Sequence, residues 1–131
     1  MAGPGTGADK TYKAEVSLAS SQFAVVVAGA ADGGMKLPAA AGEGRILGVL
    51  QDYPADEQFG RVRKRDISTV VLAGTVAYGD SLEIANAAGD VRKFSSQANA
   101  IVGQSEMAGV SGDQIEAFLN VWPGDVIHPS S

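Results

Sequence analysis

The strongest constraint on this chain is the way its apolar runs stay short, alternate with polar residues and stop at glycine-containing turns. Apolar and polar side chains alternate over residues 12–18 and 114–121, and shorter apolar runs cover 23–28 and 45–50. A period of two is typical of half-buried strands, and no window has the period of a helix. With turn signals roughly every ten residues, the pattern predicts about nine short strands in an all-β fold, either a sandwich or a small β-barrel.

Two glycine-containing segments and one short internal sequence similarity, which we call the internal echo, suggest how these strands are connected. Asp32-Gly33-Gly34 and residues 86–89 have the composition of tight turns. Residues 45–48, followed by a polar turn and Gly60, resemble residues 100–103, followed by a polar turn and Gly112. The echo fits two similar β-units that close one barrel, and it equally fits coincidence in a chain rich in glycine and valine.

The ends of the chain lack the strand pattern. Residues 1–11 contain alternating glycines and no apolar periodicity, and the pattern also stops at Pro123. We therefore expect a flexible N-terminal arm over 1–11, a β-domain over 12–122 and a C-terminal tail over 123–131. Deleting residues 1–11 should leave the fold intact.

Composition excludes several kinds of function. The 131 residues contain no cysteine and a single histidine, His128. Thiolate metal sites, disulfides and a cysteine nucleophile are therefore excluded, and a histidine in a terminal tail is poorly placed as a general base. We expect no catalytic residue, no cofactor and no metal. An enzyme would have to use carboxylates alone.

Charge and hydropathy limit the partners. The formal net charge is −5, which disfavours nucleic acid as a partner, and no apolar run has the length of a membrane span. The first residues lack the basic and apolar regions of a signal peptide, so we expect synthesis and use in a cytosol.

Arg61-Val-Arg-Lys-Arg65 is the sharpest local feature, because it holds four of the ten Lys and Arg residues. On one strand, Arg61, Arg63 and Arg65 would line a single face. Such a face fits a solvated edge strand that discourages unwanted sheet pairing, or a contact to an acidic partner surface. Nucleic acid is a third and less favoured alternative.

The order of the motifs resembles that of the small capsid decoration, or cement, proteins of tailed bacteriophages. The resemblance covers about residues 12–121. The segments that carry it are Ile-Leu-Gly-Val-Leu (46–50), Val-Val-Leu-Ala-Gly (70–74), Gly-Asp-Ser-Leu (79–82), Ile-Val-Gly (101–103) and Gly-Asp-Gln-Ile (112–115). The basic run and the tail after Pro123 depart from the family's pattern.

This resemblance implies a β-barrel or β-tulip domain on the outer surface of a phage head, made in the host cytoplasm. Its partners would be the major capsid protein and further copies of itself, as a homotrimer. The contact candidates in the arms and in the basic run are Gly3, Pro4, Thr6, Lys10, Arg61, Arg63, Arg65 and Trp122. The alternatives are another virion β-module of the tail, connector or receptor-binding type, and a small β-barrel that binds a ligand or carbohydrate.

Overall fold

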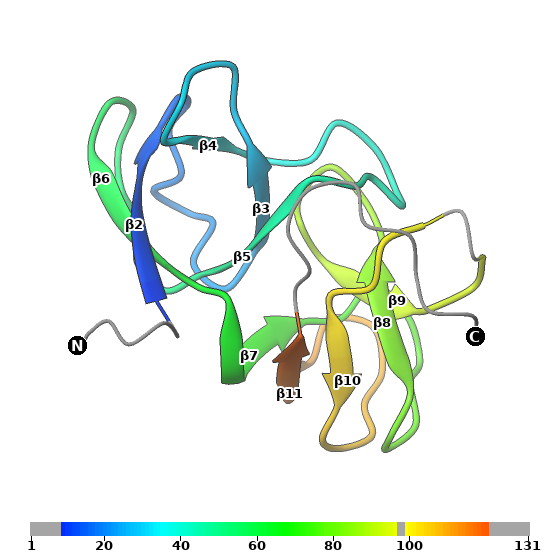
Figure 1. Ribbon diagram of the computed structural model, residues 1–131. Coiled ribbons are helices and arrows are strands. Elements are labelled where there is room, and N and C mark those ends of the chain that lie inside the picture. The colour runs from blue at the N-terminus through cyan, green and yellow to red at the C-terminus, as the bar shows by residue number, and fades with distance from the viewer. Residues whose placement is uncertain (1–8, 97–98, 121–131) are drawn as a thin grey trace.

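The computed structural model describes residues 9–96 and 99–120, and in these residues every regular element is a strand. The strands fall into two groups of five, one after the other along the chain. Figure 1 shows the two groups beside each other. The first unit contains β2 (Asp9–Ala14), β3 (Val25–Ala28), β4 (Gly34–Lys36), β5 (Ile46–Leu50) and β6 (Phe59–Arg63). The second unit contains β7 (Arg65–Val71), β8 (Ser81–Ile84), β9 (Val91–Lys93), β10 (Gly103–Ser105) and β11 (Gln114–Asn120). The all-β prediction is confirmed.

The described part of the chain has no helix that is long and apolar enough to cross a membrane.

The two units have the same strand topology. The first is a closed barrel in the order β2-β4-β3-β5-β6, and the second is a sheet in the order β7-β11-β10-β8-β9. In each unit the first strand pairs with the fifth, the fifth with the fourth, the fourth with the second and the second with the third. The first and third strands also meet in parallel, as β2 with β4 in the barrel and as the Leu72–Val91 bridge in the second unit.

Backbone hydrogen bonds outside the strands repeat in the same way. The nitrogens of Ala14, Glu15 and Leu18 donate to the carbonyls of Gln58, Met35 and Pro54. At corresponding positions of the second unit, the nitrogens of Leu72, Ala73 and Val76 donate to the carbonyls of Asp113, Val91 and Gly109. The internal echo therefore reflects two similar β-units. The expectation that they close one barrel is wrong, because the five strands of the first unit close a barrel alone and those of the second form a separate sheet.

Gly48 and Gly103 occupy corresponding places in the repeat. A Cβ built at Gly48 would overlap the carbonyl oxygen of Arg63, and one built at Gly103 would overlap that of Phe118. Both glycines allow the fourth strand of a unit to cross the fifth at close range. This explains why each echo segment ends in glycine.

The two units share their larger core. Val26, inside the barrel, packs with a cluster confined to the first unit. Val25 and Val27 point out of the barrel on the other face of β3 and join the core of the second unit, together with Val49 of β5. Both faces of β3 are thus buried, which accounts for the continuous apolar run at 23–28.

A fully buried carboxylate fixes the chain after β9. Glu83 of β8 has no exposed surface and accepts hydrogen bonds from Arg92 Nε (2.6 Å), from Ser95 N and Oγ (3.1 and 2.9 Å) and from Asn99 Nδ2 (2.9 Å). Burial raises the pKa of Glu83, but the hydrogen bonds from Asn99, Ser95 and Arg92 outweigh it, so the net shift is downward. The charged form is therefore the one that the fold stabilises.

The first strand begins earlier than the sequence pattern indicates. Asp9, Lys10 and Thr11 belong to β2 and pair with Arg63, Val62 and Arg61 of β6. Pairing with the neighbouring strand β6 extends β2 over residues 9–11, which have no apolar alternation. A deletion of residues 1–11 would remove half of β2, so the expectation of an intact fold applies only to a deletion of residues 1–8. Residues 1–8 and 121–131 lie outside the described part of the chain.

We predict that Gly103→Ala destabilises the protein by about 1–3 kcal/mol, because the methyl group would overlap the backbone of β11. Gly74→Ala is the matched control, since its Cβ would meet no atom closer than the Cβ of Arg92 at 4.0 Å. Urea unfolding of both variants measures the difference. Equal midpoints for the two variants would contradict the close approach at Gly103.

We predict that Glu83→Gln lowers the free energy of unfolding at pH 7 by about 1.5–3 kcal/mol, the usual worth of hydrogen bonds to a charged group. Because the folded-state pKa of Glu83 lies below its ordinary 4.5, the carboxylate contributes fully above that pH. Its contribution disappears as the pH falls through the folded-state pKa. The stability gap between wild type and variant should therefore close in acid, whereas Glu106→Gln, at an exposed position, should cost little at any pH.

Candidate partner-contact surface

The basic run is divided between the two units. β6 ends at Arg63 and β7 begins at Arg65, so the prediction that Arg61, Arg63 and Arg65 line one face of one strand is wrong. Lys64 lies between the strands, and its Nζ donates to Tyr12 Oη at 2.8 Å and to the Leu47 carbonyl at 3.0 Å. These inward contacts turn the chain out of the barrel at the point where the basic residues were expected to continue as a strand.

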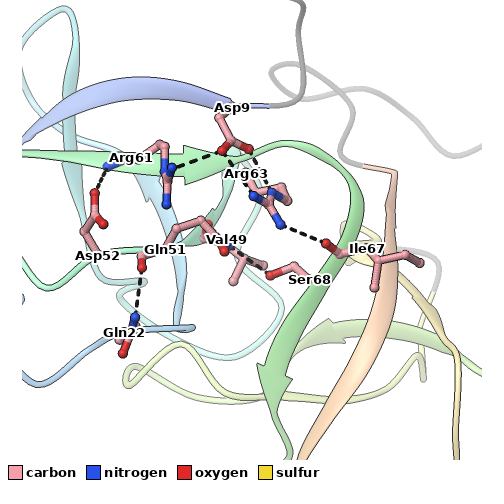
Figure 2. A network of polar contacts seen from close by, with 9 residues as sticks. All are labelled: Asp9, Gln22, Val49, Gln51, Asp52, Arg61, Arg63, Ile67 and Ser68. Atoms are coloured by element: carbon pink, nitrogen blue, oxygen red, sulfur yellow. Dashed lines mark hydrogen bonds and ion pairs between the residues drawn. The ribbon is translucent and has the colours of Figure 1, made fainter.

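Asp9 neutralises two of the arginines. Its carboxylate lies 2.9 Å from Arg63 Nε, 3.3 Å from Arg63 Nη2 and 3.5 Å from Arg61 Nε (Figure 2). The hydrogen bond to Asp9 raises the pKa of Arg63. Arg63 Nη1 also donates to the carbonyl of Ile67 at 3.1 Å, so this side chain joins β2 and β6 of the barrel to β7 of the second unit. Arg63 acts mainly as a connection within the protein.

A second set of polar contacts lies beside this ion pair. Gln51 Nε2 donates to the carbonyl of Val49 at 3.1 Å and to Ser68 Oγ at 2.9 Å, and Ser68 Oγ donates to the carbonyl of Thr69 at 3.0 Å. Figure 2 shows Gln51 and Ser68 meeting between the two units, near Arg63. The boundary between the units is therefore fixed by hydrogen bonds at its rim as well as by the shared core.

Three cations of this region remain directed to solvent. Lys10 is exposed and its Nζ lies 5.3 Å from the centre of the Tyr12 ring, and Lys64 Nζ lies 5.1 Å from the same centre. The Arg61 side chain keeps 52% of its surface exposed. Arg65 is exposed and has no ion-pair partner among residues 9–96 and 99–120. Lys10 and Arg65 are thus unpaired cations available to a partner among the described residues, and Arg61 remains accessible beside its ion-pair partner Asp9.

Gly3, Pro4, Thr6 and Trp122 lie outside the described residues, as does His128.

A shallow cavity of about 300 Å³ lies in the first unit, between β2 and the turn before β4. Glu15 accepts hydrogen bonds there from the nitrogens of Ala30 and Ala31 at 2.8 and 2.9 Å, which lower the pKa of its carboxylate, that from Ala31 first. Lys13 pairs with Glu57 at 3.1 Å. Two carboxylates of the cavity, Glu15 and Glu57, are thus already engaged, and the described residues hold no group of three or more side chains of the metal-binding type.

Sequence reasoning missed two features that the structure makes plain. Asp9 was assigned to the arm, although it anchors Arg61 and Arg63. The alternation over 114–121 already places Phe118 on the outward face of β11, where it is 44% exposed, but it does not indicate that Ile67 stands opposite it.

No protein-family model matches this chain, and no curated protein matches it. Among solved structures, the chain is similar to the head fiber gp8.5 N base in bacteriophage phi29, with a TM-score of 0.66. The similarity covers 92% of this chain and 98% of that chain, at 12% sequence identity. At this identity the comparison establishes a shared fold, which extends over both five-stranded units.

Proposed function

We propose that this protein is a structural component of a bacteriophage virion that attaches to the outside of the head by binding the major capsid protein. The observation that carries the proposal is the similarity of fold, over nearly the whole of both chains, to the base of a phage head fiber. The order of short sequence motifs, which resembles that of capsid decoration proteins, supports it independently. The role needs a stiff body and contact surfaces, and it requires no catalytic group.

The same comparison favours a second candidate, a base that anchors a fiber to the head. Both candidates place the two-unit body on the capsid. They differ in what extends from it: a decoration protein braces neighbouring capsid subunits, for which we propose a homotrimer, whereas a fiber base carries a further elongated part.

The exposed cations supply a plausible capsid contact. Arg63 and Lys64 are committed to contacts within the protein, but Lys10 and Arg61 lie at the surface of the barrel and can meet an acidic patch. Exposed ion pairs contribute about 0.2–1 kcal/mol each and weaken as salt screens them. Such contacts would steer and orient the protein, and many copies on one shell would add their effects.

We predict that electron microscopy of phage heads assembled with this protein will show added density on the outer surface, absent from heads assembled without it. Compact density at each position supports the decoration role, and density continuing into a thin extension supports the fiber base. Heads that are identical with and without the protein would refute both.

We predict that the pair Lys10→Ser and Arg61→Ser weakens binding to heads about two- to tenfold at low ionic strength and has little effect at high salt. The pair Arg45→Ser and Lys93→Ser, which also removes two exposed cations, is the control for net charge. Equal weakening at all salt concentrations would indicate loss of fold, and equal weakening by the control would exclude a specific contact.

A further inference from the structure

Two large apolar side chains are exposed side by side on the outer face of the second unit. Ile67 of β7 and Phe118 of β11 are 39% and 44% exposed and stand directly opposite each other in the antiparallel register. Their neighbours along the strands, such as Val70 and Ala117, point inward and are fully buried. Directly opposite side chains on one face of a sheet lie close enough to act as one surface. We refer to Ile67 and Phe118 as the apolar pair.

The repeat shows that the fold does not require an apolar pair at this place. The corresponding positions of the first unit are Asp9 and Arg63, which also stand opposite each other and form the ion pair at the boundary between units. There, the outer face of the unit is covered by the second unit, through Val25, Val27 and Val49.

On the second unit the described residues cover the same outer face only at Glu83, which lies beneath the segment after β9. The positions that correspond to Val25, Val27 and Val49 are Ser81, Glu83 and Gln104. Gln104 pairs with both Ser81 and Phe118 and is exposed. Glu83 is buried, so the open part of this face consists of the half-buried Ser81 and the exposed Gln104, which are polar, and of the apolar pair.

Charges of opposite sign flank the apolar pair along the strands. Arg65 lies two residues before Ile67 on β7, and Glu116 lies two residues before Phe118 on the antiparallel β11. Because the strands are antiparallel, the cation and the anion fall at opposite ends of the pair. Both are exposed, and neither has an ion-pair partner in the part of the chain that the structure describes.

This arrangement is complementary to itself. When two such faces meet with their strands running in opposite directions, the Arg65 end of one lies over the Glu116 end of the other. A closed ring of three copies, with strands running around the axis, also brings each Arg65 end to the next Glu116 end. Isologous pairs and closed rings are the usual ways in which identical chains associate.

We propose that the occupant of this face is a second copy of this chain, with the apolar pair at the centre of the contact and Arg65 of each copy paired with Glu116 of another. The contact is small compared with the roughly 800 Å² that each partner buries in a stable interface, so association in solution is weak and depends on concentration. The inference concerns self-association and does not depend on the proposed role on a phage head.

Sedimentation equilibrium of the full chain over a wide concentration range tests the proposal. Wild type should associate to dimers or trimers, and Phe118→Ser should weaken association about tenfold or more, as the loss of a central aromatic contact does. Arg65→Glu and Glu116→Arg should each weaken it, because each places like charges together. The variant with both changes should recover most of the wild-type association, because the pairing is restored with its signs reversed.

Tyr53→Ser is the matched control, since it removes an aromatic side chain that is 65% exposed on the first unit, and it should leave association unchanged. Thermal unfolding of each variant verifies the fold. A wild type that is monomeric at every concentration, or a double variant no better than the singles, would overturn the proposal. Association of a variant truncated after Asn120, with none for the full chain, would also overturn the proposal, because residues 121–131 would then be what covers this face. Head binding is measured separately, so either proposal can fail alone.

Discussion

The shared apolar core between the two units is the interaction on which the rest of this structure depends. Val26 faces the inside of the barrel, while Val25, Val27 and Val49 face out of it and are fully buried against the second unit. Removing one such side chain from water contributes about 1.5–3 kcal/mol. The second unit therefore supplies the outer cover of the first.

The rim contacts give this junction a single orientation. Hydrophobic packing is not directional, whereas Arg63 reaches Asp9 on one side and the Ile67 carbonyl on the other with defined geometry. The hydrogen bond between Gln51 and Ser68 adds a second fixed point. This explains why a run of basic residues that resembles a partner-binding strand is largely used within the protein, and why only part of it remains for a partner.

How far the sequence predicts this structure depends on how local each feature is. The turns at 32–34 and 86–89 follow from nearby glycines, and the strands at 12–14 and 114–120 follow from local alternation. The division into a barrel and a second sheet of the same topology does not, because it depends on distant pairs such as Leu72 with Val91. Asp9 was missed for the same reason, since its partner Arg63 lies 54 residues away. The echo at 45–48 and 100–103 was the one trace of the repeat, and it was too short to separate duplication from chance.

Equivalent positions of the two units differ in chemistry because different things cover them. Val27 is apolar because the second unit packs on it, whereas Glu83, at the corresponding position, is buried beneath the segment after β9 and fully hydrogen-bonded. By the same logic we expect polar residues at exposed positions, but Ile67 and Phe118 are apolar and exposed. The corresponding positions of the first unit hold an ion pair. A weak contact between copies would account for that departure. On a shell that repeats its binding positions, such a contact and the exposed cations of the barrel would add to one another, since each bound copy raises the effective concentration of its neighbours. A protein that is held by several weak contacts of this kind needs no single strong binding site.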